Sequence, residues 1–175
     1  MREGLLERIA WAPAAGPRPA TGIQIIHAET VVPASLDDTF RFFSDAANLE
    51  RLTPPWLNFR IRTPLPIVMR EGTEIDYRIG LHGWPIPWRS RIDVWEPGRR
   101  FVDRQLRGPY RWWHHEHGFE ATEGGTRVTD HVEFLPRLPR FTGGFVRRDV
   151  ERIFAYRQET LSQLLPGPGE PHAGG

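Results

Sequence analysis

The spacing of hydrophobic positions changes period twice along the chain, and these changes outline the fold. Residues 23–32 alternate as in a β-strand, and Pro33 ends that strand. The next residues recur at the spacing of one helix face, so that one stripe carries Leu36, Thr39, Phe40 and Phe43. Ser35 with Asp38 three positions later resembles an acidic capping box, which places the start of this helix at Ser35.

A second short helix is expected at about residues 46–52. It must end before Pro54 and Pro55, because proline cannot continue a helix. From Phe59 to Leu135 the period returns to two. Turn signals at residues 64–66, 80–83, 96–98, 108–109 and 123–125 divide this stretch into about six strands. Short turns between consecutive strands predict an antiparallel meander.

Helical spacing returns at about residues 142–165. The apolar residues of this segment lie on one side of the predicted helix: Val146, Val150, Ile153, Phe154, Leu161 and Leu164. The charged residues lie largely on the other side: Arg147, Arg148, Glu151, Arg152 and Glu159. The apolar face of such a helix must be buried, and the sheet is the only large partner available. The sequence therefore predicts an α+β fold in which a curved antiparallel sheet of about seven strands encloses one long C-terminal helix.

Residues 23–165 are expected to form a single domain. Pro- and Gly-rich sequences at both ends predict a partly disordered extension over residues 1–22 and a disordered tail over residues 166–175. Residues 1–12 could also form a short amphipathic helix. A strongly curved sheet around one helix leaves an interior space, and small ligands bind in such spaces.

The register of the hairpin that turns at residues 123–125 can be worked out by hand. Centring the turn there pairs positions whose numbers sum to about 247. One face then holds Phe119–Val128, His117–Asp130, His115–Val132 and Trp113–Phe134. The other face holds Glu120–Arg127, Glu116–His131 and His114–Glu133. Opposite charges on the second face indicate the solvent side, so His115, His117 and Asp130 are predicted to point inward.

The preceding hairpin turns at residues 96–98, so the numbers of its paired residues sum to about 195. This register pairs Val94 with Phe101, Ile92 with Asp103 and Ser90 with Gln105. It places Asp103 and Gln105 on an apolar face, with Arg91 and Arg104 outside. Tyr77 is a further inward candidate, and Trp84, Trp88 and Trp113 are candidates for the cavity wall, with Trp56 near its mouth. The two prolines within residues 84–88 indicate an edge strand or a bulge.

Charged and imidazole groups on an apolar face need a reason, because burying them unpaired is costly. A structural hydrogen-bond network, for instance from His117 to Asp130, is one reason. A second is a polar patch that orients a ligand or provides acid and base, with His117, His115, Asp130 and Asp103 as the catalytic candidates. A third is a metal site, since two histidines two positions apart on a strand can bind zinc or iron together with a carboxylate.

Composition excludes several other chemistries. The 23 basic residues are all Arg and there is no Cys, which rules out Schiff-base lysines, thiol nucleophiles, disulfides and thiolate metal sites. The net charge of +1 gives no global attraction to nucleic acid. No apolar stretch approaches the roughly 20 residues of a membrane span, and charged residues near the N-terminus argue against a signal peptide. We expect a soluble, cytoplasmic protein.

Several separated segments resemble the SRPBCC superfamily, which includes START-type and Bet v 1-like proteins and polyketide cyclases. These segments are residues 23–43, 49–54, 101–105, 108–110, 115–119, 130–136 and 154–157. More specifically, the chain looks like bacterial ligand-binding SRPBCC proteins, which are relatives of the cyclase/dehydrase group. The resemblance implies a helix-grip fold with a hydrophobic tunnel for lipids, polyketides or other apolar compounds. It supplies no universal catalytic residue.

The function expected from these observations is binding of a small, mostly apolar ligand as a carrier or sensor. The alternatives are an enzyme of the cyclase or dehydratase type, and a protein–protein interaction module that docks through its sheet or long helix. We expect no cofactor, no metal, no nucleic acid, and a monomer or weak homodimer. The predicted ligand-binding residues are Tyr77, Trp88, Ser90, Asp103, Gln105, Trp113, His115, His117, Phe119, Asp130, Val132, Phe134, Val150 and Phe154.

Overall fold

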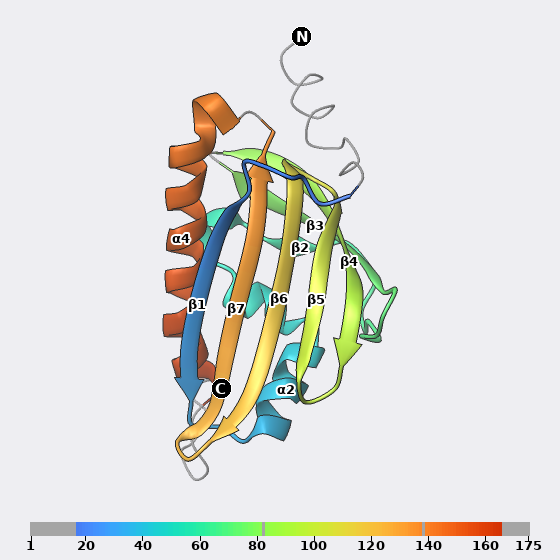
Figure 1. The fold of residues 1–175 in the computed structure, drawn as a ribbon. Coiled ribbons are helices and arrows are strands. Elements are labelled where there is room, and N and C mark those ends of the chain that lie inside the picture. Colours follow the sequence, from blue (N-terminus) through green and yellow to red (C-terminus); the bar gives the residue numbers. More distant parts are fainter. Residues whose placement is uncertain (1–16, 82, 138, 166–175) are drawn as a thin grey trace.

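The structure, a computed structural model, describes residues 17–81, 83–137 and 139–165. Its elements are β1 (Gln24–Val32), α2 (Leu36–Ser44), α3 (Asn48–Leu52), η1 (Pro55–Leu57), β2 (Arg60–Ile61), β3 (Glu74–Leu81), β4 (Trp84–Glu96), β5 (Arg100–Arg107), β6 (Tyr110–Thr122), β7 (Gly125–Pro136) and α4 (Pro139–Leu164). The strands form one antiparallel sheet in the order β1-β7-β6-β5-β4-β3-β2. The predicted fold class is confirmed: a seven-stranded sheet curves around one long helix (Figure 1).

The helices after β1 begin and end where the sequence dictates. The Ser35 hydroxyl accepts a hydrogen bond from the Asp38 backbone N–H at 3.1 Å, and this contact caps α2. α3 ends at Leu52, ahead of Pro54, and a 3₁₀ turn follows. α4 begins at Pro139, earlier than predicted, which agrees with the tolerance of proline in the first turn of a helix.

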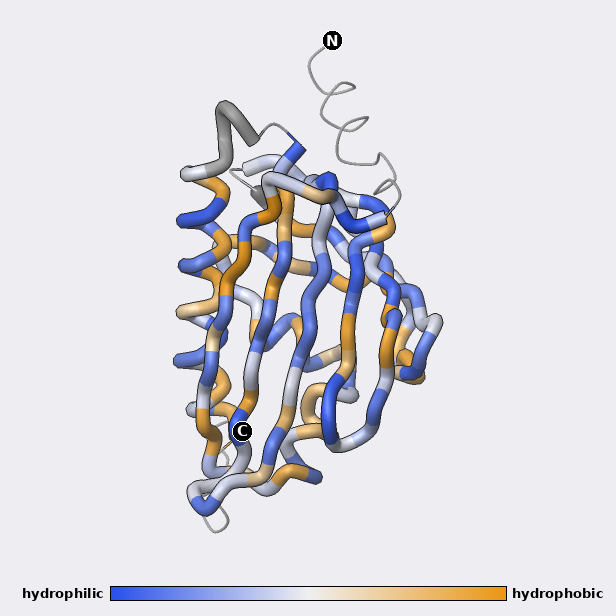
Figure 2. Tube along the Cα trace, viewed as in Figure 1, coloured by the Kyte–Doolittle hydropathy of each residue, from blue (hydrophilic) through white to orange (hydrophobic). Residues whose placement is uncertain are grey.

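The register predicted for the β6–β7 hairpin is confirmed. His117 lies opposite Asp130, and His115 lies opposite Val132. On the outer face Arg127 pairs with Glu120 at 2.6 Å, as the charge pattern predicts. Along the strands, hydrophobic and hydrophilic residues alternate, and α4 turns its hydrophobic residues toward the sheet (Figure 2).

The β4–β5 register is confirmed in part. Ser90 lies opposite Gln105 and Ile92 opposite Asp103, as predicted. The prediction that Val94 faces Phe101 is wrong: a register shift between Ile92 and Val94 pairs Val94 with Val102. An extra residue in one strand displaces every later pair, and turn placement alone does not reveal it.

The first residues of β4 behave as an edge. Residues 84–88 pair with β3, and the pairing of β4 with β5 starts only at Arg89. Pro85 and Pro87 therefore occupy positions with one neighbouring strand, where a missing N–H is tolerated.

The core consists of two apolar clusters. One lies under α2 and the C-terminal part of α4 and is represented by Phe43, Phe119 and Leu161. The other lies under the N-terminal part of α4 and is represented by Trp88 and Phe134.

The ends of the chain fall mostly outside the described residues, as does the helix considered for residues 1–12. Within the expected extension, Arg18 makes two contacts with the carboxylate of Glu133 at 2.7 and 2.9 Å, so this part packs against β7. Within the described ranges, no helix combines the length and apolar character that crossing a bilayer requires.

Candidate functional site

A cavity of about 480 Å³ lies between the concave face of the sheet and the helices. Its lining comes from α2, α3, β3, β4, β5, β6 and α4, and most of it is apolar. The apolar side chains that contribute to it include Phe42, Leu49, Met69, Ile75, Ile79, Ile92, Phe101, Val146 and Ile153. A cavity of this size and character is of the kind that binds small molecules.

One end of the cavity has an aromatic wall. Trp88 stacks against Tyr77 with ring centroids 5.7 Å apart, and it meets Trp113 edge-on at 5.2 Å. Tyr110 lies 5.5 Å from Trp88, and Phe59 extends the wall behind Tyr77 at 4.9 Å. These offset and edge-to-face contacts fix the rings in place and leave flat apolar surfaces.

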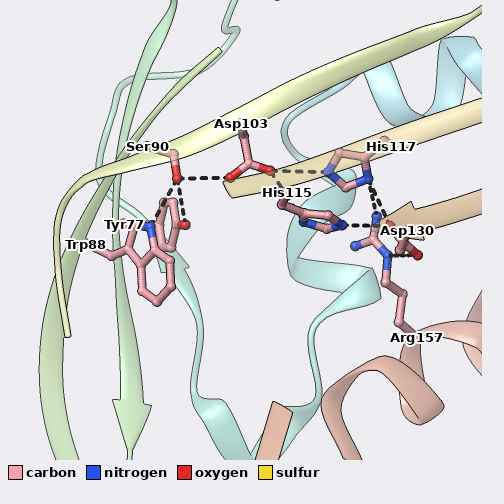
Figure 3. A network of polar contacts seen from close by, with 8 residues as sticks. All are labelled: Tyr77, Trp88, Ser90, Asp103, His115, His117, Asp130 and Arg157. Atoms are coloured by element: carbon pink, nitrogen blue, oxygen red, sulfur yellow. Dashed lines mark hydrogen bonds and ion pairs between the residues drawn. The ribbon is translucent and has the colours of Figure 1, made fainter. Parts of the chain in front are cut away.

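Two imidazoles and two carboxylates form a closed ring of contacts (Figure 3). Asp130 Oδ1 lies 2.8 Å from His115 Nε2 and 3.0 Å from His117 Nδ1. Asp103 Oδ2 lies 3.4 Å from His115 Nδ1 and 3.2 Å from His117 Nε2. Each ring nitrogen therefore faces a carboxylate oxygen, and each carboxylate contacts both rings.

Strand register brings these groups together. Asp103 of β5 lies opposite His115 of β6, and His117 of β6 lies opposite Asp130 of β7. Because the two histidines are two positions apart on one strand, their rings share a face, with centroids 3.7 Å apart. Phe101 stacks on His117 at 4.2 Å and completes the local packing.

Arg157 of α4 supplies the positive charge of this cluster. Its Nε lies 3.3 Å from Asp130 Oδ2, and its Nη2 lies 3.3 Å from His117 Nδ1. Its guanidinium also lies over the ring of Phe43, 5.2 Å from the centroid. Arg157 is only 6% exposed and Asp130 only 2%, so the ion pair is shielded from solvent. This ion pair joins α4 to the ring of contacts at Asp130.

Ser90 connects the ring to the aromatic wall. Its hydroxyl donates to Asp103 Oδ1 at 3.3 Å and accepts from Trp88 Nε1 at 3.0 Å. The Tyr77 hydroxyl is a third partner at 3.1 Å. The polar groups of the cavity thus form one continuous network from Tyr77 to Arg157 (Figure 3).

Burial and neighbouring charges set the ionisation of the network. Burial lowers the pKa of His115 to about 4, helped by the charge of His117 and opposed by Asp130 and Asp103. Burial alone would raise the pKa of Asp130, but Arg157 and the two histidines outweigh it and hold that pKa well below its ordinary value.

Burial and neighbouring charges also shift the pKa values of two further groups on the cavity wall. Burial would raise the pKa of Asp103, but the hydrogen bond from His117 and the charges of the two histidines and Arg157 keep it below its ordinary value. Burial raises the pKa of the Tyr77 phenol well above its ordinary value, and the carboxylate of Asp103 adds to that rise. Tyr77 therefore remains a neutral hydroxyl.

The structure divides the predicted site residues into two groups. The residues that line the cavity are Tyr77, Trp88, Ser90, Asp103, Trp113, His115, His117 and Phe154. The others lie in the surrounding wall and are buried without forming the cavity lining: Gln105, Phe119, Asp130, Val132, Phe134 and Val150. Gln105 instead closes the β5–β6 turn, because its amide donates to Tyr110 O and accepts from Tyr110 N.

Trp84 was expected in the cavity wall but does not line the cavity. It is 48% exposed at the start of β4. Aromatic content does not reveal on which side of an edge segment a ring will lie. Trp56, predicted near the mouth, is not part of the lining; it is 45% exposed and packs against Tyr156 and under the guanidinium of Arg152.

Sequence reasoning missed the role of Arg157. The signal was available, because Arg157 lies three residues after Phe154 and four before Leu161, on the apolar stripe of α4. A charged residue on the buried face of a helix requires a buried partner. The contributions of α2 and α3 to the cavity were also missed, since the predicted pocket was built from strands and α4 alone.

Part of the chain matches a protein family whose function is not defined. Residues 89–165 match a family described as a domain of unknown function (DUF8410). No curated protein sequence matches the chain.

Solved structures show the same architecture. A protein from Chromobacterium violaceum is similar over 82% of this chain and 98% of its own, with 16% identity and a TM-score of 0.66. The Zhui aromatase/cyclase from Streptomyces sp. R1128 is similar over 80% and 92%, with 17% identity and a TM-score of 0.63. Ara h 8.0201 is similar over 80% and 98%, with 17% identity and a TM-score of 0.53.

These likenesses define the fold of the protein. The chain has the helix-grip fold that its sequence predicted, and the three solved structures share it. Identities this low establish the fold alone. Fold does not assign a reaction, so the function must be argued from the cavity.

Proposed function

We propose that this protein binds a small, mostly apolar ligand, such as a lipid, polyketide or aromatic compound, in the cavity between the sheet and α4. The observation that carries the proposal is the cavity itself, which has about 480 Å³ of space and a predominantly apolar lining. Small-molecule sites in proteins are concave, mostly apolar spaces of about this size with a few polar groups.

The aromatic wall favours a flat ligand. Trp88 and Trp113 meet at nearly a right angle, so a planar ring system can stack on one while its edge meets the other. The Asp103 carboxylate and the Ser90 hydroxyl mark the polar end of the same cavity, where they can accept or donate hydrogen bonds to a ligand hydroxyl. Apolar contacts supply most of the affinity, and the polar groups select the orientation.

The proposal is tested with 1-anilinonaphthalene-8-sulfonate, a flat probe whose fluorescence rises in apolar surroundings. Val146 lines the cavity from α4, so Val146→Trp places an indole inside it. Val31, which is 47% exposed on β1, provides the matched control Val31→Trp. We expect wild type and Val31→Trp to bind the probe equally and Val146→Trp to bind it at least tenfold more weakly. Equal binding by all three proteins would refute the proposal.

A second candidate function is catalysis of the cyclase or dehydratase type. It is favoured by one observation: His115 and His117 line the cavity, and each has a carboxylate on either side. A carboxylate beside an imidazole fixes its orientation and supports proton transfer to or from a bound substrate. One structural neighbour is an aromatase/cyclase, which makes a linear poly-β-ketone the first substrate to offer.

In that assay, His117→Gln should abolish product formation while leaving the circular dichroism spectrum and probe binding unchanged. Undiminished turnover by His117→Gln would eliminate acid–base catalysis by this residue. If the variant fails to fold, the structural interpretation of the network is the correct one.

A further inference from the structure

The ring of histidines and aspartates brings two imidazole nitrogens to one carboxylate oxygen. Four contacts join ring nitrogens to carboxylate oxygens, at distances of 2.8 to 3.4 Å. His115 Nε2 is hydrogen-bonded to Asp130 Oδ1 at 2.8 Å, and His117 Nε2 to Asp103 Oδ2 at 3.2 Å. Because a guanidinium has no acceptor, Arg157 Nη2 donates to His117 Nδ1 at 3.3 Å.

Asp103 Oδ2 therefore faces one nitrogen of each ring, His115 Nδ1 at 3.4 Å and His117 Nε2 at 3.2 Å. A histidine nitrogen must be free of a proton to bind a metal, and metal binding displaces protons from its ligands. The other nitrogens of the two rings, His115 Nε2 and His117 Nδ1, lie 2.8 and 3.0 Å from Asp130 Oδ1. When a cation displaces the proton of His117 Nε2, the N–H of that ring can move to Nδ1, where Asp130 accepts it.

We propose that Asp103, His115 and His117 form a binding site for a divalent transition-metal ion. The donor atoms of these three residues lie within 4.8 Å of one another. In a tetrahedral zinc site with ligand distances of about 2.0–2.2 Å, neighbouring donors are roughly 3.3–3.5 Å apart. The two distances from Asp103 Oδ2, 3.4 and 3.2 Å, lie close to that spacing. A cation bound there is coordinated by one nitrogen of each ring and by Asp103 Oδ2.

The surroundings are those of a metal site. Metal-binding histidines usually donate their second N–H to a carboxylate, which fixes the ring and increases its basicity. With a metal bound, Asp130 is placed to take this role for both rings, at 2.8 Å from His115 Nε2 and 3.0 Å from His117 Nδ1, and Arg157 holds Asp130 by an ion pair at 3.3 Å. Ser90 donates to the other oxygen of Asp103 at 3.3 Å and orients that carboxylate.

The site has an open side. Asp103, His115 and His117 all line the cavity, whereas Asp130 lies behind them in the wall. Two histidines and one carboxylate leave at least one coordination position free, which is typical of metal sites that bind a substrate or water. An oxygen of a ligand in the cavity can occupy it. This inference departs from the expectation that the protein has no metal, and it does not depend on the identity of the apolar ligand.

The test uses the full chain, freed of metal with a chelator, without any apolar ligand. We expect one equivalent of Zn²⁺ or Co²⁺ to bind by calorimetry. Asp103→Ala should weaken binding at least 100-fold, and Asp130→Asn should weaken it about 10–100-fold, since it perturbs the groups that hold the rings. His131→Ala is the matched control. His131 is the neighbour of Asp130 on β7, and it lies opposite Glu116 on the other face of the sheet. Its removal should have no effect.

A second measurement on the unmodified protein guards against variants that do not fold. With Co²⁺ bound, two exchangeable imidazole N–H signals should shift strongly in the proton NMR spectrum, one from each ring. Absence of these signals, equal binding by wild type and Asp103→Ala, or loss of the bound equivalent in His131→Ala would each overturn the proposal. Failure of metal binding with normal binding of 1-anilinonaphthalene-8-sulfonate would leave the ligand-binding proposal standing.

Discussion

Removing the Arg157 side-chain charge tests the interior electrostatics most sharply. In Arg157→Leu the aliphatic part of the side chain is largely retained, whereas the guanidinium is lost. Asp130, which is 2% exposed, then keeps its contacts with the two histidines but loses its ion pair. This substitution therefore leaves the buried Asp130 carboxylate without the guanidinium that forms its ion pair.

The expected magnitude follows from the burial of both partners. Breaking a buried ion pair by removing one partner costs about 3–5 kcal/mol, because the remaining charge stays desolvated and uncompensated. The cation–π contact with Phe43 at 5.2 Å is lost as well, which is worth roughly 0.5–2 kcal/mol. The leucine side chain recovers part of that packing. We therefore expect the free energy of unfolding to fall by about 3–5 kcal/mol, which corresponds to roughly 6–20 °C in Tm for a chain of this length.

Urea unfolding followed by circular dichroism measures this change. The control is the double variant Arg157→Leu/Asp130→Asn, in which the isolated charge is also removed. It should be more stable than the sum of the two single variants predicts, with a coupling of about 1–3 kcal/mol. A loss below about 1 kcal/mol in Arg157→Leu, or simple additivity in the double variant, would refute the ion pair as a source of stability.

Three further changes test the framework around the cavity. Ser90→Ala removes the acceptor for the Trp88 indole N–H and should lower the free energy of unfolding by about 1–3 kcal/mol; an unchanged indole N–H chemical shift of Trp88 would contradict the contact. Ser35→Ala removes the cap of α2 and should cost about 0.5–2 kcal/mol by urea unfolding, whereas Ser35→Asp should cost less. Gly125 has a φ of +125°, and an added Cβ would overlap the carbonyl oxygen of Val32, so Gly125→Ala should cost about 1–3 kcal/mol. Wild-type thermal stability of Gly125→Ala would show that the β6–β7 turn is not constrained in this way.

The strand register could be predicted because it depends on residues that are close together in the sequence. A turn at residues 123–125 and a period of two determine every pair of the β6–β7 hairpin, and cross-strand charges report the outer face independently. From that register alone, His115, His117 and Asp130 could be placed on the inner face. The same reasoning failed at Val94, because a bulge depends on side-chain packing that neither the turn nor the alternation encodes.

The contents of the cavity were harder to predict because they depend on how separate elements meet. His117 was expected to pair with Asp130 across the strands, but its partners also include Asp103 from the next strand and Arg157 from α4. These contacts join residues 14 to 40 positions apart, and they follow from sheet curvature and helix placement. Gln105 illustrates the converse: it is inward and polar as predicted, yet it serves the neighbouring turn.

A crystal structure of the protein soaked with 2-naphthol is the most direct test of the ligand-binding cavity. We expect electron density for the naphthalene ring within the cavity, stacked on Trp88 or Trp113, with its hydroxyl toward Asp103 or Ser90. An interior filled by side chains, or naphthol bound only at the outer surface, would contradict it.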